Sequence, residues 1–513
     1  MKKYIPYILA GAVGALPIAI PAIGFLHLVL LIPFGYFCLS EEKRKAKIEY
    51  FCGLLFFFGY FAVCYSWFFA MYPLSVTGMS RIAALAVVIL ASFGIALFQA
   101  LGFAFIFLIA RKVNMSKYLF PFFVGVLWCI GEWVQNFFWF GLPFVRIALS
   151  QTNAIEFCSS ANLFGSYFVS FIIVTINMLL ALSFKEKDKK SKTILALFAL
   201  IIFVSNSAYG VIHTQRSAKN AYSTVKVSAF QGNISTEEKW SDTMLDRSLI
   251  IYERLAKEAA DAGAEYILLP ETVIPYVTEE YDDIDSFFTD LAWHHGIKIM
   301  LGTFGRVDDG TGNIIRVYEP MRKPINVYTK QKPVPFGEYI PMRGILTSLF
   351  PPLGEINILQ RSLTPGNEST TWEDEGITFG YLICFDSIYS SLARESIQNG
   401  ADILMISTND SWFGTSHGLT MHLTHAKLRA IENGRSVLRA ANTGISAAIS
   451  PHGEVIEIIG ADETGQITVS LPIAENETLY TKIGDWFVYF SMLFALFCIF
   501  FPKKRNKSTV PSS

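Results

Sequence analysis

Residues 379–386 read FGYLICFD, an apolar run with β-strand character that ends at a cysteine and continues into an acid. Cys384 lies in a polar region, whereas the other six cysteines lie in or beside apolar runs, at Cys38, Cys52, Cys64, Cys129, Cys158 and Cys498. A lone thiol cannot form a disulfide within its own domain, so this region does not rely on a disulfide framework. A single cysteine is usually buried and inert, but a nucleophile at a strand end stays possible.

The region around this strand has the composition of a water-soluble α/β domain. We expect strands at 225–231, 266–269, 297–302, 377–383, 403–407, 446–450 and 467–471, and helices at 240–262, 287–295, 388–398 and 417–433. Helical patterns lie between the earlier strands, and the later strands follow one another closely. This alternation predicts a layered α/β sandwich.

Two other polar segments follow apolar runs in this region. Residues 267–272 read ILLPET and place Glu271 at the C-terminal end of a strand, where the sites of α/β proteins gather. Residues 328–339 read YTKQKPVPFGEY and form a proline-rich loop that carries Lys330 and Glu338. Taken singly, Glu271 fits a helix cap and Lys330 fits a solvated lysine. If the fold brings them to Cys384, they supply a base and a positive charge to a nucleophile.

The rest of the chain is strongly apolar. Of the 513 residues, 52% are hydrophobic and 17% charged, the mean hydropathy is +0.39 and the formal net charge is −1. Soluble proteins carry about 25% charged residues, so a disordered chain is excluded, and a nucleic-acid binder is disfavoured because no basic excess exists. We predict eight membrane spans near 4–20, 22–40, 50–71, 82–110, 118–139, 160–184, 193–212 and 484–501. A cleaved signal peptide is the alternative for the first.

The basic residues outside the α/β region predict the orientation. Clusters of Lys and Arg occur at 2–3, 43–47, 111–117, 185–192 and 503–507, and eight spans place all of them on one side. Lys and Arg favour the cytoplasmic side, so we expect both termini to be cytoplasmic. The predicted domains are therefore a seven-helix membrane domain at 1–212, an outward α/β domain at 213–483, and an eighth helix with a basic cytoplasmic tail at 484–513.

Glu271, Lys330 and Cys384, in this order within an α/β domain, resemble the Glu-Lys-Cys triad of the nitrilase (carbon–nitrogen hydrolase) superfamily. With the flanking helices, nearly the whole chain resembles the apolipoprotein N-acyltransferase family within it. The matching segments are QGNI at 231–234 followed by Lys239-Trp240, PET at 270–272, VPFGEYIP at 334–341, NDSWFG at 409–414, RAIENGR at 429–435 and RAANTG at 439–444.

The resemblance implies a multi-pass α-helical membrane domain joined to an α-β-β-α sandwich in the inner membrane of a bacterium. It also implies that Cys384 takes an acyl chain from a phospholipid, at the sn-1 position of phosphatidylethanolamine, and passes it to the N-terminal amine of an S-diacylglyceryl-cysteine apolipoprotein. Glu271 would be the general base, Lys330 the oxyanion stabiliser, and Glu338 a support for the lysine or its loop. Supporting or substrate-binding roles fall to Trp240, Asn313, Phe385, Asp386, Asn409 and Trp412. We expect a monomer without metal or cofactor.

Some positions depart from the family pattern. Phe385-Asp386 stands where Tyr-Glu is usual, Pro333 stands where Leu is usual, and residues 141–144, GLPF, replace a loop that carries a tryptophan. Two other functions stay open. One is a membrane-anchored amidase or nitrilase that hydrolyses a carbon–nitrogen bond, and the other is a transporter or binding protein with an inactive domain. Glu132, inside a predicted span, fits helix packing better than a functional site.

Overall fold

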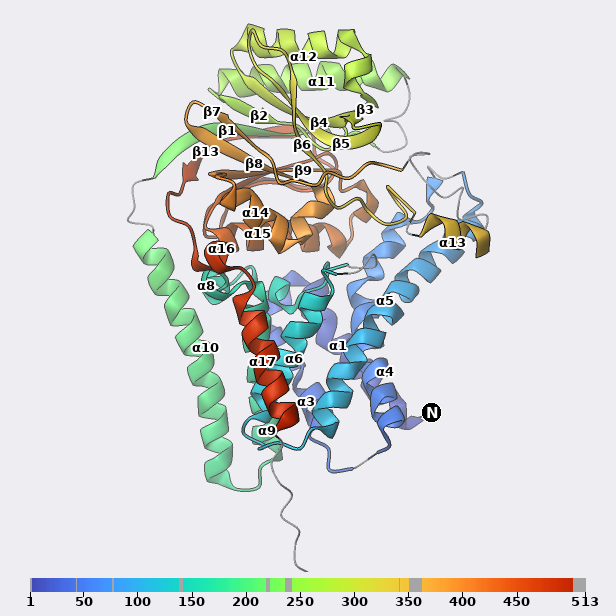
Figure 1. Cartoon of the computed structure of the whole chain (residues 1–513), viewed down its shortest axis with the longest axis vertical. Coiled ribbons are helices and arrows are strands. Elements are labelled where there is room, and N and C mark those ends of the chain that lie inside the picture. The colour runs from blue at the N-terminus through green and yellow to red at the C-terminus, as the bar shows by residue number, and fades with distance from the viewer. Residues whose placement is uncertain are drawn as a thin grey trace, which may run out of the picture.

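The computed structural model describes residues 2–42, 44–75, 78–137, 142–217, 222–235, 242–340, 342–349 and 362–501. Helices fill one end of the molecule and two sheets with their own helices fill the other (Figure 1). Trp240, Pro341 and the basic residues at 503–507 lie outside the described residues.

Apolar helices lie at each of the eight predicted segments. They are α1 (Ile5–Ala19), the run Pro21–Cys38 made of η2 (Pro21–Leu26), α2 (His27–Leu30) and α3 (Ile32–Cys38), α4 (Ala46–Cys64), α5 (Arg81–Lys112), α6 (Phe120–Val134), α9 (Ser166–Lys185), α10 (Lys189–Ser217) and α17 (Trp486–Phe500). By length and composition, five of these segments can cross a membrane: Pro21–Cys38, α4, α5, α9 and α10 through Arg216. α6 and α17 are apolar but shorter, and α1 has 15 residues. Eight crossings therefore stay a prediction.

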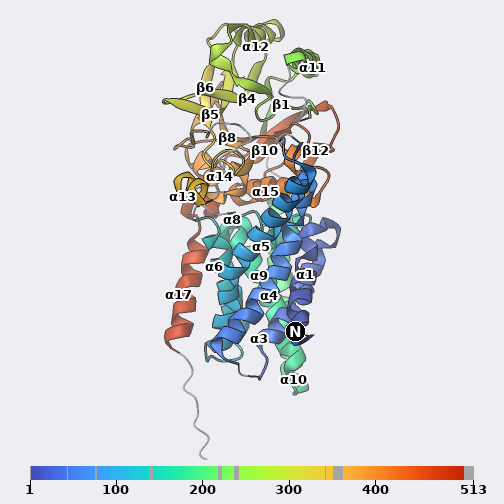
Figure 2. The ribbon, with the colours of Figure 1, turned by 90° about the vertical axis from the view of Figure 1, so that its right-hand side faces the viewer.

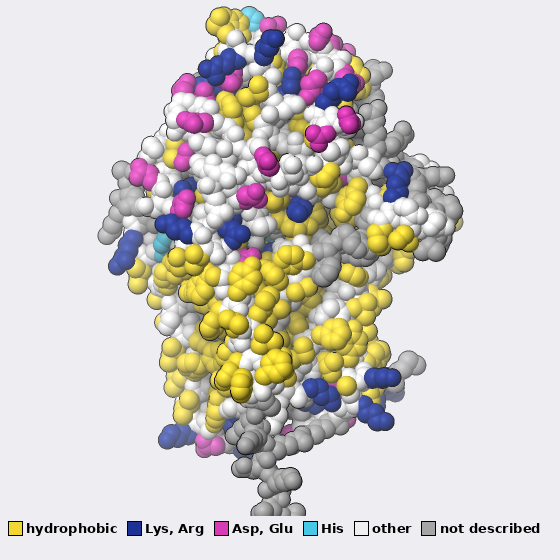
Figure 3. All heavy atoms as spheres, viewed as in Figure 1, with side chains coloured by type: hydrophobic (Ala, Val, Ile, Leu, Met, Phe, Trp, Pro, Cys, Tyr) yellow, Lys and Arg dark blue, Asp and Glu magenta, His cyan; other side chains and the backbone are white. Residues whose placement is uncertain are grey.

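Short elements complete the helical half. They are η1 (Lys2–Tyr4), η3 (Ser66–Met71), η5 (Ile147–Gln151), α7 (Ile155–Cys158) and α8 (Ala161–Phe164). Hydrophobic side chains cover the visible surface of this half, while charged side chains gather over the sheets and at the opposite, lower edge (Figure 3). Ile82 and Leu90 on α5, and Leu493 and Phe500 on α17, are among the large exposed side chains. Such an apolar belt is the surface that a lipid bilayer covers.

Two glycines bring α1 and α4 into close contact. A Cβ atom at Gly11 would lie 1.8 Å from the carbonyl oxygen of Phe56, and one at Gly59 would lie 2.2 Å from that of Ile8. No real side chain fits such gaps, so the two backbones touch. Small residues at helix contacts are typical of membrane helix packing, where van der Waals contact replaces the hydrophobic effect.

The other half contains two sheets. The first has the order β13-β1-β2-β4-β5-β6 with β3 beside β4, and the second has the order β12-β11-β10-β9-β8-β7. The strands of the first are β1 (Ser223–Gln231), β2 (Tyr266–Leu268), β3 (Ile274–Val277), β4 (Lys298–Val307), β5 (Gly310–Tyr318), β6 (Ile325–Thr329) and β13 (Gly465–Ile473). Those of the second are β7 (Thr371–Asp374), β8 (Ile377–Ile383), β9 (Ile403–Thr408), β10 (Ser436–Ala441), β11 (Ser446–Ile449) and β12 (Val455–Ile459).

The sheets lie face to face between two helical layers. Leu268 and Met300 of the first sheet share a buried core with Tyr381 and Met405 of the second. α11 (Asp242–Asp261) and α12 (Asp282–His295) cover the first sheet, whereas α14 (Ser390–Gln398) and α15 (His417–Asn433) lie between the second sheet and the membrane half (Figures 1 and 2). The expected α-β-β-α sandwich is confirmed.

The layer of α14 and α15 belongs to both halves. One continuous apolar core includes Leu428 and Ile431 of α15 together with Phe144 and Phe157 of the membrane half. Hydrogen bonds cross the same boundary, because Glu432 Oε1 accepts from the backbone N–H of Ser166 at 3.1 Å. Remaining short elements of this half are η6 (Thr278–Glu280), α13 (Arg343–Leu349), η8 (Cys384–Ile388), η9 (Ser411–Phe413) and α16 (Leu479–Ile483).

We predict that Gly11→Ala destabilises the membrane half by about 1–3 kcal/mol, because the new methyl group forces α1 away from α4. Thermal unfolding of the detergent-solubilised protein measures the change. Gly94→Ala on α5 is the matched control, since nothing lies within 4 Å of its Cβ position. It should leave the melting temperature unchanged or raise it slightly. Equal melting temperatures for the two variants would contradict the close contact of α1 and α4.

Candidate active site

Glu271 lies three residues after the end of β2 at Leu268 and accepts hydrogen bonds from three groups. It is 5% exposed. Its Oε1 accepts from Lys330 Nζ at 2.8 Å and from Asn313 Nδ2 at 2.7 Å, and its Oε2 accepts from the backbone N–H of Asn409 at 2.9 Å. Lys330 and Asn313 come from the first sheet, whereas Asn409 follows β9 of the second. The carboxylate therefore joins the two sheets at the edge where both end.

Lys330 follows β6 and lies between two carboxylates. Its Nζ donates to Glu271 Oε1 and to Glu338 Oε1, each at 2.8 Å, and the side chain is 2% exposed. Burial alone would lower the pKa of Lys330, but the two carboxylates raise it well above its ordinary value. Lys330 is therefore a fixed positive charge. Glu338 Oε2 accepts from the backbone N–H of Val334 at 2.7 Å, so Glu338 holds both the ammonium and its loop.

Cys384 follows β8 directly and is the first residue of η8. Its φ of +48° lies in the left-handed region, which costs a non-glycine residue free energy and persists where the surroundings impose it. The thiol is near enough to Glu271 and Lys330 for both charges to act on it. Burial raises the pKa of Cys384 far above its ordinary value, Glu271 raises it further, and Lys330 and a hydrogen bond with Thr408 lower it. Burial and Glu271 thus favour the neutral thiol at Cys384, and Lys330 acts in the opposite direction.

The supporting residues divide into two groups. Asn313 and Asn409 bind Glu271 directly. Asp386 is buried and does not bind Glu271. It accepts hydrogen bonds from the Tyr328 hydroxyl at 2.9 Å and from the Lys332 backbone N–H at 2.8 Å, on either side of Lys330 in the sequence. Burial raises the pKa of Asp386 to about 6. Asp386 thus fastens the strand and loop that carry the lysine.

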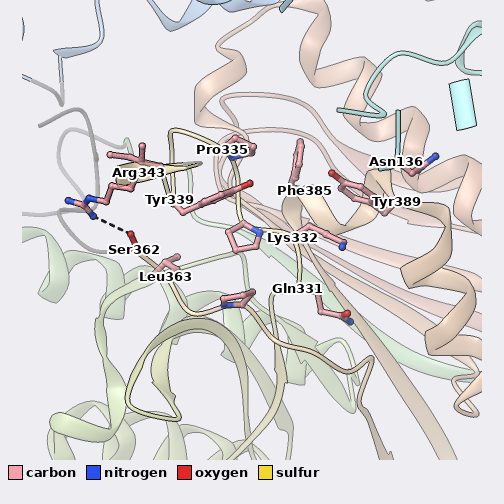
Figure 4. Close-up of a pocket in the computed structure, with 13 residues that line it drawn as sticks. Asn136, Gln331, Lys332, Pro335, Tyr339, Arg343, Ser362, Leu363, Phe385 and Tyr389 are labelled. Carbon is pink, nitrogen blue, oxygen red and sulfur yellow. Dashed lines mark hydrogen bonds between the residues drawn. The ribbon is translucent and has the colours of Figure 1, made fainter. Parts of the chain in front are cut away.

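Two aromatic candidates lie nearer the membrane half. Trp412 lies in η9 and is partly buried, and Phe413 beside it packs on Trp67 with ring centroids 4.8 Å apart. Phe385 lines a cavity of about 500 Å³ together with Tyr339, Lys332 and Tyr389. Asn136, which follows α6, also lines it, so this cavity lies where the two halves meet, and Phe385 in its wall is the residue after Cys384 (Figure 4).

Sequence reasoning missed several residues around Cys384. Thr408, Ser387 and Asp410 are buried and are hydrogen-bonded to one another or to the cysteine. The signal for Asp410 was present, because this acid lies two residues after the apolar strand β9 ends at Thr408. Among the described residues, no group of three or more His, Cys, Asp or Glu side chains could hold a metal ion.

We predict that iodoacetamide alkylates Cys384 slowly at pH 7 and faster as the pH rises beyond 9, because burial raises the pKa of the thiol. Glu271→Gln removes a charge that disfavours the thiolate, so alkylation at pH 8 should be faster than in the unmodified protein. Mass spectrometry of the peptide that contains Cys384 measures both rates. Fast alkylation at pH 6 would contradict the raised pKa.

Known proteins match both halves of the chain. The family model "Carbon-nitrogen hydrolase" matches residues 226–479, and "Apolipoprotein N-acyltransferase N-terminal domain" matches residues 10–179. The apolipoprotein N-acyltransferase of Shewanella oneidensis is 28% identical over 87% of this chain and 86% of its own length. That of Haemophilus ducreyi is 28% identical over 97% of this chain and 96% of its own. Among solved structures, an amidase from Nesterenkonia sp. is 17% identical, with a TM-score of 0.39, over 53% of this chain and 98% of its own.

The two models divide the chain where the structure does, into a helical half and a sandwich that carries Glu271, Lys330 and Cys384, and the relatives match it nearly end to end. The chain belongs to the apolipoprotein N-acyltransferase family, whose catalytic half is of the carbon–nitrogen hydrolase type.

Proposed function

We propose that this protein transfers an acyl chain from a phospholipid to the N-terminal α-amine of S-diacylglyceryl-cysteine apolipoproteins, through a thioester on Cys384. The observation that carries the proposal is the buried pair of Glu271 and Lys330 beside Cys384, on a sandwich that shares its core with apolar helices. Phosphatidylethanolamine, acylated at sn-1, is the proposed donor. No metal or cofactor is needed, because the chain's own groups supply the base, charge and nucleophile.

In the first step the thiol loses its proton to Glu271 as Sγ attacks the ester carbonyl of the donor. Because burial disfavours the free thiolate, proton transfer and attack occur together on a bound ester. The oxyanion forms near the Lys330 ammonium, which two carboxylates already fix in place and which therefore needs no reorganisation. The carbon–oxygen bond breaks, and Glu271 returns the proton to the departing lysophospholipid.

In the second step the amine of the apolipoprotein attacks the thioester. Glu271 takes a proton from the attacking nitrogen, an amide bond forms, and the Cys384 sulfur leaves and regains a proton. Two successive transfers on one nucleophile predict ping-pong kinetics. Glu338 keeps its bond to Lys330 throughout, and Asn313 and Asn409 hold the carboxylate in reach of both protons.

Both substrates carry long acyl chains, and each buried CH₂ group contributes about 0.8 kcal/mol to membrane partitioning. The cavity beside Phe385 and Asn136 lies where the sandwich meets the helices, so a lipid can reach Cys384 without leaving the bilayer completely. We propose that this cavity admits the ester and the lipidated cysteine in turn. Phe385, Trp412 and Trp240 are proposed substrate contacts.

We further propose eight membrane crossings, with residues 1–212 and 484–513 forming the membrane part and residues 213–483 facing the periplasm. Cytoplasmic termini follow from the basic clusters. The helices at all eight predicted segments support this arrangement. A single chain contributes all the proposed catalytic residues, which supports a monomer.

Cys384→Ser should lower the rate of N-acylation by at least about 10³-fold while leaving a folded protein, because the hydroxyl is a much weaker nucleophile than the thiolate. Glu271→Ala and Lys330→Ala should do the same. Mass spectrometry of a lipoprotein's N-terminus, in cells with and without each variant, measures the added acyl chain. An acylated N-terminus with Cys384→Ser would exclude this nucleophile.

The same measurement separates the alternative functions. A membrane-anchored hydrolase would leave the lipoprotein amine free and release product to water. A binding protein with an inactive sandwich would form no acyl-enzyme on Cys384. Labelled phospholipid incubated with the purified protein should instead give a thioester that hydroxylamine cleaves.

The orientation is tested by single cysteines introduced at exposed positions. Lys257→Cys on α11 should react with a membrane-impermeant maleimide in intact spheroplasts, whereas Lys189→Cys at the start of α10 should react only after permeabilisation. Native cysteines other than Cys384 are buried, so their background is low. Labelling of both positions from one side would contradict the proposed topology.

A further inference from the structure

A second buried polar cluster lies under the nucleophile and takes no part in the steps above. We call it the carbonyl network, and it consists of Ser387, Asp410, His422 and Arg439. Each of its members is at most 1% exposed. Burying so many polar groups is costly unless they bind one another, so the network requires a structural or chemical reason.

Two members of the network bind the backbone of Cys384. The Ser387 hydroxyl donates to the Cys384 carbonyl oxygen at 2.7 Å. His422 Nε2 lies 3.2 Å from the same oxygen and 3.0 Å from Ser387 Oγ. A carbonyl oxygen only accepts hydrogen bonds, so the contact of Nε2 with it is a hydrogen bond when Nε2 carries the ring proton, and we assign the proton to Nε2. Both donors thus hold the peptide group that follows the strained residue.

The other members hold the imidazole ring. His422 Nδ1 lies 2.9 Å from Asp410 Oδ1, and Arg439 Nη2 donates to Asp410 Oδ2. Asp410 Oδ1 also accepts from the Thr408 hydroxyl at 3.0 Å, and Thr408 in turn hydrogen-bonds the Cys384 thiol. Asp410 is therefore linked to the thiol by one route and to the carbonyl of the same cysteine by another.

The helix that carries His422 is fixed on its far side by the membrane half. His417 Nε2 lies 3.2 Å from the Cys64 carbonyl oxygen, and His425 Nε2 lies 3.1 Å from that of Phe144. On the near side, Arg429 Nη1 donates to the carbonyl oxygen of Ile388 at 3.2 Å, just beyond the nucleophile turn. α15 is therefore fixed to the membrane half on one side, and on the other side it holds the His422 ring against the backbone of Cys384.

We propose that His422 is a positioning residue for the nucleophile: its Nε2–H, together with the Ser387 hydroxyl, holds the Cys384 carbonyl and so keeps the cysteine in the left-handed conformation beside Glu271 and Lys330. The inference rests on the proposed function, because it assigns a support to the nucleophile named there. A residue with φ of +48° relaxes toward extended or helical backbone when its surroundings release it. Such a movement takes the sulfur away from the base.

Two substitutions of His422 distinguish the contributions of its two ring nitrogens. His422→Gln places an amide donor near the position of Nε2 and keeps the bond to the Cys384 carbonyl. His422→Asn keeps an amide facing Asp410 and is too short to reach that carbonyl. We expect His422→Asn to lower kcat for acyl-enzyme formation by about 10- to 100-fold with KM within about 3-fold, since small misplacements of reacting groups have effects of this size. His422→Gln should stay within about 3-fold of the unmodified protein.

The full-length protein in nanodiscs, acylated by phospholipid with a labelled acyl chain, gives these rates. Thr424→Ala is the matched control, because Thr424 is a buried polar residue of the same helix whose hydroxyl donates to the Met421 carbonyl oxygen within the helix and not to Cys384. Its kcat should stay within about 3-fold. Ser387→Ala, a small change that folds readily, should slow acylation by about 10-fold.

The proposal is overturned if His422→Asn acylates at the unmodified rate, if His422→Gln is as slow as His422→Asn, or if Thr424→Ala is equally slow. If His422→Asn does not fold, Ser387→Ala decides, and an unchanged kcat then overturns it. Absence of any label on Cys384 in the unmodified protein would instead refute the proposed function, so the two failures are distinguishable.

Discussion

The site depends on one buried ammonium group. Removing Lys330 from water costs several kcal/mol unless opposite charges and hydrogen bonds replace the lost hydration. Glu271 and Glu338 do so, each at 2.8 Å from Nζ. One ammonium between two carboxylates leaves an excess negative charge, and the neutral donors Asn313 and the Asn409 backbone stabilise it. The ion pair of Glu271 and Lys330 needs groups carried by β5 and by the segments that follow β2, β6 and β9. The two sheets must therefore face each other in the one alignment that brings these groups together.

The fold could be predicted from the sequence where one face of an element was buried. β8 and α15 have the predicted limits of 377–383 and 417–433, because apolar runs and a final glycine at Gly434 mark them. The strands β3, β5, β6, β7, β10 and β12 were not predicted. β10 contains Arg439, and a charged residue argues against a buried strand. The strand can be buried because Arg439 pairs with Asp410, which the sequence does not show. β5 begins with glycines, and β12 is an exposed edge that carries Glu457 among isoleucines.

The candidate site was predictable in part for the same reason. Glu271, Lys330 and Cys384 follow strands, and an α/β domain brings strand ends together. The roles of Asp386 and His422 were not predictable, because each depends on a partner far away in the sequence: Tyr328 for the first and Cys384 for the second. Asp386, which stands with Phe385 where the family has Tyr-Glu, was expected in a supporting or substrate-binding role. Its hydrogen bonds with the Tyr328 hydroxyl and the Lys332 backbone join it to the strand and loop of Lys330.

The apolar core shared by the two halves offers a reason why the proposed site would transfer an acyl chain to an amine and not to water. The thioester proposed on Cys384 would lie in a region where burial disfavours a free charge on the sulfur, and exclusion of water from such a site limits hydrolysis of an intermediate. α14 and α15 close the sandwich on the side of the membrane half, and they share one apolar core with its helices. The opening at Phe385 and Asn136 therefore faces the junction with the membrane half. The proposed acceptor, a lipid-anchored amine, would be concentrated at that junction by its acyl chains.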